Sequence, residues 1–285
     1  MTLELRATPE EVMRAVEALQ KFAKAHGVPE KAIFGFALSL EECGSNIVNH
    51  ALQRDRYKTF QVAFEHTGSA VIIELRDRGP AFDPTAAAER KPQADDDDLP
   101  GGWGLHLVRR YMDEIRYQRE AGVNVLRLAK RLAPETGAKS PSSINPHNHG
   151  PKPQTDMPLK ILILKAVGDK NIGAVTIKLT GSLDTATAPD LERQLTPVLA
   201  GPIKHLVFDL SELNFISSAG LRLFSIARKQ LKERGGQASF VSLQPQIQEV
   251  FEIMKSLPGV SIFKDMAEMD RYLAAIQRKH QEKNQ

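Results

Sequence analysis

Residues 41–50 read Glu41-Glu42-Cys43-Gly44-Ser45-Asn46-Ile47-Val48-Asn49-His50, in the second half of a predicted helix that opens at Pro29-Glu30. Proline suits a first helical turn because its missing N–H has no helical acceptor there. At 3.6 residues per turn one stripe is apolar or small, and it comprises Ile33, Ala37, Leu40, Gly44, Ile47 and Ala51. The opposite stripe is polar, and it comprises Glu42, Asn46, Asn49 and His50. Two asparagines weaken a helix, so this polar face either binds something or is an ordinary solvated surface.

Two glycine-containing segments follow farther along the chain. The first comes after an apolar run typical of a buried strand and reads Asp77-Arg78-Gly79-Pro80-Ala81-Phe82-Asp83-Pro84. The second comes before an amphipathic helix and reads Gly101-Gly102-Trp103-Gly104-Leu105. Glycine-rich turns that lead into a helix offer backbone N–H groups and a positive dipole end to phosphates. Neither segment fits the P-loop pattern, so each one alone is a weak signal.

The order of the three segments is more specific than any one of them. A helix with Glu-x-x-x-Asn-x-x-x-His, then Asp-x-Gly after a strand, then Gly-Gly-x-Gly-Leu before a helix resembles the GHKL (HATPase_c, or Bergerat) ATP-binding fold of histidine kinases and gyrase. Within that fold the sequence looks like the serine-kinase anti-sigma factors of bacterial partner switching. The resemblance covers about residues 5–133.

This resemblance implies ATP and Mg²⁺ as ligands and gives roles to individual residues. Asn46 would bind Mg²⁺ through its carboxamide oxygen, because that hard cation prefers oxygen ligands. Glu42, one helical turn earlier, would be the catalytic base that accepts a proton from an attacking hydroxyl, unless it is merely a carboxylate on the helix surface. Asp77 would accept a hydrogen bond from the adenine amino group, and Gly79 would let the backbone approach the base.

The remaining residues of the implied site surround the phosphates. Gly101, Gly102 and Gly104 would close over them, together with Trp103 and Leu105. His50 matches a family position near the nucleotide, and a packed histidine is the alternative. Ala81 stands where many members have a second glycine. Phosphoryl transfer needs mostly positioning and charge neutralisation, so Mg²⁺, one base and a glycine lid form a sufficient set.

The composition is that of an ordinary globular protein. The chain has 285 residues, 41% hydrophobic and 26% charged, with a net charge of +3, and no basic stripe indicates nucleic acid. The single cysteine, Cys43, excludes an internal disulfide and is expected to be a packed thiol. We find neither a signal peptide nor an apolar run of about eighteen residues, and therefore expect a cytoplasmic protein without membrane contact.

The first half is predicted to be an α/β sandwich. Helices are expected at about 8–27, 29–51 and 105–114, and strands at 58–65, 70–76, 115–119 and 124–128. The run Asp95-Asp96-Asp97-Asp98 is expected in a mobile lid rather than at a metal. Residues 134–157 are rich in Pro, Ser, Asn, Gly and Lys and are predicted to be a flexible linker, whose His147 and His149 are more often incidental than metal ligands.

Alternation of strands and helices predicts a second α/β domain with parallel pairing after the linker. The phrases Gly181-Ser182-Leu183-Asp184, Phe208-Asp209-Leu210-Ser211 and Leu213-Asn214-Phe215-Ile216-Ser217-Ser218-Ala219-Gly220 together resemble the STAS domain of anti-anti-sigma factors, over about residues 158–277. In that family a phosphorylatable Ser or Thr starts the helix, and Ser218 matches it. Ser217 stands at the usual Asp position and Ala219 at a frequent second hydroxyl. A serine that only caps a helix is the alternative role for Ser218.

The resemblances together predict two α/β domains: a GHKL kinase domain at 1–133, a linker at 134–157 and a STAS domain at 158–285. The expected function is an ATP-dependent protein serine kinase of partner switching that regulates sigma-factor-dependent transcription by phosphorylating a STAS serine. Expected partners are a sigma factor, STAS-domain anti-anti-sigma proteins, and the other domain of the same chain or of a dimer. Two alternatives stay open, a non-catalytic nucleotide-dependent binding regulator and a histidine kinase. The second is disfavoured because no dimerising helix with a phosphoacceptor histidine precedes the ATP domain.

Overall fold

The computed structural model describes residues 1–87, 103–132, 158–165, 174–253, 261–269 and 271. The chain divides into two compact units; the described residues 1–87 and 103–132 belong to the first, and those from 158 onwards belong to the second. The predicted linker at 134–157 and the run Asp95-Asp96-Asp97-Asp98 lie outside the described residues.

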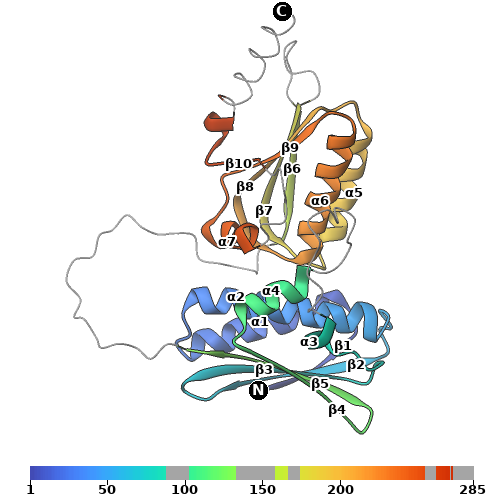
Figure 1. The fold of residues 1–285 in the computed structure, drawn as a ribbon, viewed down its shortest axis with the longest axis vertical. Coiled ribbons are helices and arrows are strands. Elements are labelled where there is room, and N and C mark those ends of the chain that lie inside the picture. Colours follow the sequence, from blue (N-terminus) through green and yellow to red (C-terminus); the bar gives the residue numbers. More distant parts are fainter. Residues whose placement is uncertain (88–102, 133–157, 166–173, 254–260, 270, 272–285) are drawn as a thin grey trace, which may run out of the picture. The chain divides into compact units, whose positions relative to one another are not determined.

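The first unit is one antiparallel sheet covered by helices on one face (Figure 1). Its strand order is β1-β2-β3-β5-β4. The strands are β1 (Thr2–Arg6), β2 (Thr59–His66), β3 (Ala70–Asp77), β4 (Glu114–Glu120) and β5 (Val123–Arg131). The helices are α1 (Pro9–Ala25), α2 (Glu30–Asn46), the π-helix η1 (Ile47–Ala51), α3 (Pro84–Ala87) and α4 (Trp103–Tyr111).

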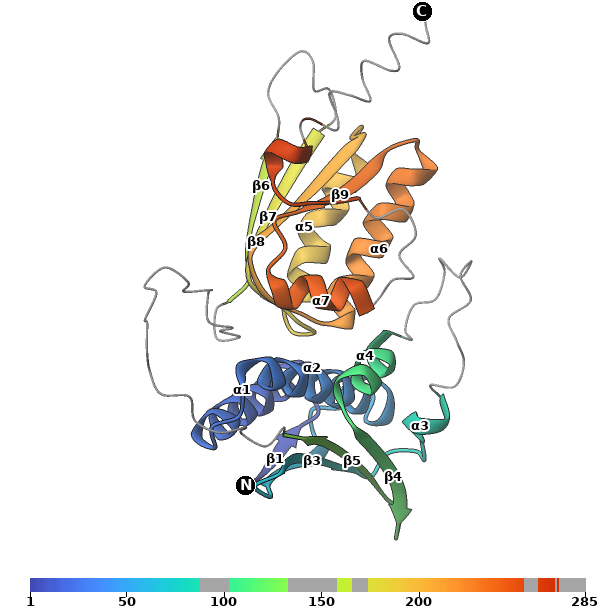
Figure 2. The same cartoon turned by 60° about the vertical axis from the view of Figure 1, so that its left-hand side comes forward.

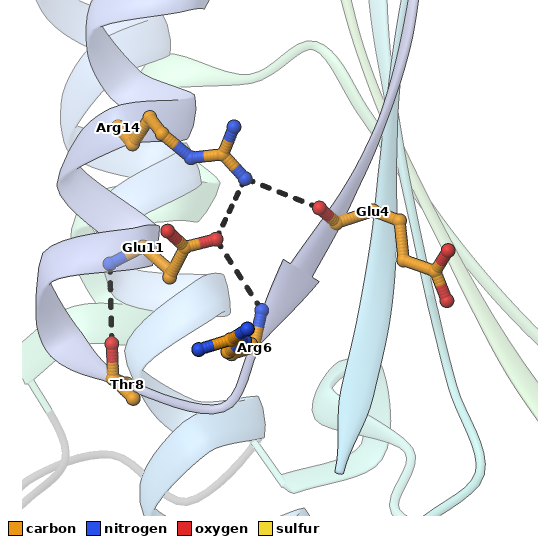
Figure 3. A network of polar contacts seen from close by, with 5 residues as sticks. All are labelled: Glu4, Arg6, Thr8, Glu11 and Arg14. Carbon is orange, nitrogen blue, oxygen red and sulfur yellow. Dashed lines mark hydrogen bonds and ion pairs between the residues drawn. The ribbon is translucent and has the colours of Figure 1, made fainter. Parts of the chain in front are cut away.

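The start of α1 is fixed by side chains that satisfy free backbone groups. Thr8 is the N-cap, and its hydroxyl accepts a hydrogen bond from the backbone N–H of Glu11 at 3.4 Å. The Glu11 carboxylate accepts from the backbone N–H of Arg6 at 3.4 Å and from the Arg14 guanidinium at 2.6 Å (Figure 3). Arg14 also donates to the backbone carbonyl of Glu4 at 3.2 Å. This network joins α1 to β1, a strand that the sequence analysis did not predict.

Helix α2 is the centre of the first unit. All of its residues from 33 to 45 are buried, since α2 packs against α1, α4 and the sheet strand β3. A helix covered on every side is largely apolar in most proteins, and here it also carries Glu41, Glu42 and Ser45. The fold therefore places two carboxylates where water does not solvate them.

The second unit is a mixed sheet with the strand order β10-β9-β8-β7-β6. The pairs β7–β8, β8–β9 and β9–β10 are parallel, as predicted, and β6–β7 is antiparallel. Its strands are β6 (Lys160–Lys165), β7 (Ala174–Leu183), β8 (His205–Ile216), β9 (Gln237–Val241) and β10 (Ser261–Phe263). Its helices are α5 (Ala188–Ala200), α6 (Ser218–Glu233) and α7 (Pro245–Ile253). Helices α5 and α6 lie side by side against one face of the sheet (Figure 2).

Both halves have the predicted α/β architecture, and the differences lie in the bounds of the elements. Strand β8 is long and runs to Ile216, because it keeps pairing with β7 through two register shifts. Helix α4 ends at Tyr111, and β4 begins at Glu114. The predicted helix 105–114 was therefore too long. Short elements such as α3 and β10 were not predicted.

Candidate functional site

Glu42 lies inside the protein, directly against the start of α4. Its side chain is buried, with 3% exposure, so the alternative of a carboxylate on the helix surface is wrong. A Cβ atom added to Gly104 would lie 3.0 Å from the carboxyl carbon of Glu42 and would overlap one of its oxygens. Only glycine leaves room for the carboxylate here. The structure thus brings together two residues that the sequence placed in one site.

The helix that carries the polar stripe changes its geometry at the site. Asn46 ends α2 and is half-buried, and residues Ile47–Ala51 continue as the π-helix η1. The predicted single helix with a 3.6-residue period therefore holds only up to Asn46. Such π turns are frequent at functional sites because the wider turn redirects the side chains after it. His50 in this turn is exposed, which disagrees with the alternative of a packed histidine.

The Asp77-x-Gly79 segment contacts Ala51, the last residue of η1. A Cβ on Gly79 would lie 2.6 Å from the Cβ of Ala51 and 2.8 Å from its carbonyl oxygen. Asp77 is buried at the end of β3, and its Oδ1 accepts the backbone N–H of Gly79 at 2.7 Å. The α2–η1 segment therefore touches both glycine segments, at Glu42 and at Ala51.

A buried asparagine that the sequence analysis missed holds this turn in place. Asn124 of β5 is directly opposite Asp77 of β3 and donates from Nδ2 to Asp77 Oδ1 at 2.9 Å. Its Oδ1 accepts from the Tyr117 hydroxyl at 2.8 Å and from the Arg119 guanidinium. Asparagine is uncommon in strands, and a buried one must be hydrogen-bonded. An asparagine between two valines in a predicted strand was therefore the feature of the sequence that could have identified Asn124 as a site residue.

Helix α4 begins with Trp103, which is half-buried, as is Leu105, while Gly104 is buried. Gly101 and Gly102 lie outside the described residues. The Arg109 guanidinium of α4 donates to the backbone carbonyl of Thr85 on α3. The elements that precede and follow residues 88–102 are thereby connected to each other.

Two further residues after η1 adopt a strained backbone. Gln53 and Arg54 both have a φ of 56°, in the left-handed region that side chains disfavour. The Arg54 guanidinium donates to Asn49 Oδ1 at 2.7 Å, and its backbone N–H donates to the carbonyl of Val48 at 2.7 Å. These bonds offset the strain and fix the side of η1 that carries Asn49.

Cys43, next to Glu42, is a packed thiol, as predicted. Burial raises its pKa far above the usual range, and the negative charges of Glu42 and Glu41 raise it further. The thiolate is the reactive form of cysteine, so Cys43 is inert at neutral pH.

In the second unit, Ser218 is the first residue of α6 and is half-buried. The N-cap is Ser217, so the alternative role of Ser218 as the cap is wrong. Ser217 is 0% exposed, and its hydroxyl has no hydrogen-bond partner among the described residues. Of the two neighbouring serines, only Ser218 is partly exposed.

The turn between β7 and α5 is next to this helix start, since the backbone N–H of Ser217 donates to the carbonyl of Leu183 at 3.0 Å. The buried Asp184 follows, and its Oδ1 accepts the backbone N–H groups of Ala186 and Thr187, each at 2.9 Å. Burial raises the pKa of Asp184, although its hydrogen bonds act in the opposite direction.

Together the residues of the first unit suit a nucleotide better than a metal held by protein alone. Among the described residues no group of three or more His, Cys, Asp or Glu side chains could hold a metal ion. A buried carboxylate, an amide oxygen at Asn46 and close backbone at Gly79 and Gly104 fit a nucleotide whose phosphates share the metal. In the described part of the chain, every helix is too short or too polar to cross a membrane.

Comparisons with known proteins divide the chain at the same place. The profile of the histidine kinase-like ATPase domain matches residues 5–130, and that of the STAS domain matches residues 164–269. The first half is 33% identical over 136 residues to the serine/threonine-protein kinase BtrW of Bordetella bronchiseptica, which covers 47% of this chain and 96% of BtrW.

The second half is similar to a different protein of the same organism. It is 37% identical over 90 residues to BtrV, named as an anti-sigma factor antagonist, which covers 32% of this chain and 78% of BtrV. Among solved structures, an anti-sigma factor antagonist from Mycobacterium paratuberculosis is 24% identical, with a TM-score of 0.35. The match covers 42% of this chain and 94% of the mycobacterial chain.

Proposed function

This chain belongs to the anti-sigma-type serine kinase family in its first half and to the STAS family in its second, and on that premise we propose that it phosphorylates a STAS serine, Ser218, with ATP. The observation that carries the proposal is the burial of Glu42 against the backbone of Gly104. A carboxylate held without water at the start of a glycine-led helix is placed to act as a base where phosphates bind.

The reaction needs one proton acceptor and an ordered nucleotide. The Glu42 carboxylate accepts the proton of the serine hydroxyl as the serine oxygen bonds to the γ-phosphorus of ATP. The bond between that phosphorus and the β–γ bridging oxygen breaks, and ADP leaves. Asp77 accepts a hydrogen bond from the adenine amino group, and Gly79 lets the backbone approach the base.

Asn46 is the residue of this chain that would hold Mg²⁺. Its carboxamide oxygen lies one helical turn after Glu42, and a hard cation takes such oxygens together with phosphate oxygens. When bound, Mg²⁺ neutralises negative charge on the phosphates. As the family resemblance implies, we expect Gly101 and Gly102 to contribute backbone N–H groups to the phosphates, and Trp103, Leu105 and His50 to contact the nucleotide.

The experiment is incubation of the full chain with labelled Mg-ATP, followed by phosphopeptide mapping. We expect label on Ser218, none in Ser218→Ala, and none in Glu42→Gln, which should still bind ATP. Asn46→Ala should weaken Mg-ATP binding itself. Ser217→Ala is the matched control and should be labelled normally, because the buried Ser217 hydroxyl cannot reach a nucleotide.

Other outcomes separate the alternatives. Nucleotide binding without any phosphoprotein would indicate a non-catalytic binding regulator. Label that is lost in acid would indicate phosphohistidine rather than phosphoserine. Normal labelling of Glu42→Gln would remove Glu42 from the role of base.

We further propose that phosphorylation controls binding to a sigma factor or to separate STAS-domain proteins. A phosphate on Ser218 adds nearly two negative charges at a position that is only half-buried, which opposes a docked partner. Ser218→Asp should therefore weaken, and Ser218→Ala should preserve, binding of such a partner in isothermal titration. Equal binding by the two variants would contradict this regulation.

A further inference from the structure

We propose that Asn124 sets the base specificity of the nucleotide site by holding the carboxylate of Asp77 in one orientation. The inference rests on the proposed function, because it takes Asp77 as the residue that contacts the base. Asn124 is a positioning residue, since it acts on the nucleotide through Asp77.

Nδ2 of Asn124 faces a set of hydrogen-bond acceptors. Asn124 is 5% exposed, and Nδ2 lies 2.9 Å from Asp77 Oδ1, 3.0 Å from the carbonyl oxygen of Pro80 and 3.4 Å from that of Gly79. Three oxygens therefore surround one amino group. A carbonyl oxygen in its place would be repelled by all three.

Oδ1 of Asn124 faces a set of hydrogen-bond donors. The Tyr117 hydroxyl donates to it at 2.8 Å, and the Arg119 guanidinium donates to it as well. The same Arg119 nitrogen donates to the carbonyl of Gly79 at 3.0 Å. Donors on one side and acceptors on the other fix the carboxamide in a single orientation, with Nδ2 towards Asp77.

The consequence concerns the two oxygens of Asp77. Oδ1 accepts from the backbone N–H of Gly79 at 2.7 Å and from Asn124 Nδ2 at 2.9 Å. Among the described residues no hydrogen bond reaches Oδ2, which is therefore the acceptor left for a ligand. A buried carboxylate oxygen accepts an amino group and repels a carbonyl. Adenine presents an amino group at its six position and guanine a carbonyl, so the fixed Oδ2 selects ATP over GTP.

Asn124→Asp tests this orientation directly, because it replaces the amino group by an oxygen of nearly the same size. The new carboxyl can hydrogen-bond to Asp77 only when it is protonated, since two adjacent carboxylates repel each other. In the full chain we expect ATP affinity to fall as the pH rises from 6 to 8, by up to about tenfold per pH unit. The wild type should be nearly flat over that range.

Preference for ATP over GTP is the second measurement. It should fall by roughly tenfold in Asn124→Asp at pH 8, the effect of one or two lost polar contacts. The matched control is Asn214→Asp, which changes a buried asparagine in the second unit and should leave nucleotide binding unchanged. Thermal unfolding without nucleotide reports whether the first unit is folded.

A milder variant keeps the test decisive if Asn124→Asp does not fold. Tyr117→Phe removes one of the two donors to Asn124 Oδ1 and should lower the ATP-to-GTP preference by about two- to fivefold. Its control is Tyr57→Phe, at a side chain that is 86% exposed, which should have no effect.

The outcomes separate this inference from the function on which it rests. If the wild type binds no nucleotide, the proposed function fails. If the wild type binds ATP but the Asn124 variant weakens ATP and GTP equally at every pH, or Tyr117→Phe keeps the full preference, Asn124 is only structural and the inference is overturned.

Discussion

The Glu42 carboxylate costs the fold desolvation energy and is also the base in the proposed reaction. Burying a carboxylate costs desolvation, and the fold places this one in the middle of its central helix. The glycine opposite makes the arrangement possible, because any side chain at 104 would occupy the space of the carboxylate. The buried Glu42 carboxylate thus explains why glycine stands at position 104.

Gly104→Ala should slow phosphoryl transfer strongly without unfolding the protein. The new methyl overlaps the end of a flexible side chain, so Glu42 moves aside while the backbone stays in place. We expect the rate to fall by about 10²–10⁴, the usual contribution of a general base, and the melting temperature to change little. Single-turnover transfer and thermal unfolding measure the two effects.

The control for this variant is His106→Ala, on the exposed side of the same helix, which should transfer phosphate normally. Normal transfer by Gly104→Ala would mean that the position of the Glu42 carboxylate does not matter.

At the scale of elements, the sequence predicted the types of the long helices and strands but not the details that shape the site. The 3.6-residue spacing of apolar residues could not show that η1 is a π-helix. A single wider turn is too short to change that spacing detectably. Burial of α2 on every side also hid the direction of Glu42, since that depends on where α4 packs. Asn124 was missed because its register opposite Asp77 follows from sheet pairing, which is not local in sequence.

The hairpin between β4 and β5 contains a strained backbone position, Ala121, that a substitution can relieve. Its two turn residues, Ala121 and Gly122, have φ of 48° and 80°, as in two-residue turns that favour Asn-Gly. Ala121→Asn should therefore stabilise the first unit by about 0.5–1 kcal/mol. Gly122→Ala should destabilise it by about 1 kcal/mol, and the cost is in the backbone, as no atom lies within 4 Å of the new Cβ.

Denaturant titration of both variants checks these values. A decrease in stability with Ala121→Asn would show that this turn does not limit the hairpin.

The turn before α5 gives a pH-dependent stability. Because burial raises the folded pKa of Asp184 above its unfolded value, the folded state keeps the proton longer. Asp184 therefore destabilises the fold increasingly as the pH rises from the unfolded pKa through the folded one, and the penalty is complete once the pH is above the folded pKa. Asp184→Asn keeps an Oδ1 acceptor for Ala186 and Thr187 and should be more stable than the wild type at pH 7.

The advantage of Asp184→Asn should disappear in acid, where the wild-type carboxyl is also neutral. Thermal unfolding between pH 3 and pH 7 follows this difference, with Asp190→Asn, an exposed position on α5, as the control. An advantage that stays constant with pH would show that the charge of Asp184 is not its cause.

At the scale of the whole molecule, two halves that match two separate Bordetella proteins share one chain. The predicted linker of about two dozen residues would have an end-to-end distance of roughly 25–30 Å if flexible. Such a tether gives an effective concentration near the millimolar range, far above that of free partners in a typical assay. Fusion therefore favours phosphorylation of Ser218 by the kinase half of the same chain or of a stable dimer.

The rate of self-phosphorylation per chain should then be independent of protein concentration from about 0.1 to 10 μM, since the tether sets the local concentration of the acceptor. Mixing two full-length variants separates the routes. Glu42→Gln keeps the acceptor and lacks the base, whereas Ser218→Ala keeps the base and lacks the acceptor. Label in the mixture can therefore arise only between chains, and we expect it to be slower than in the wild type by about a hundredfold or more at 1 μM unless a dimer exchanges subunits. A wild-type rate proportional to concentration, matched by the mixture, would show that the kinase half acts on an outside STAS domain and that the linker only keeps the two halves together.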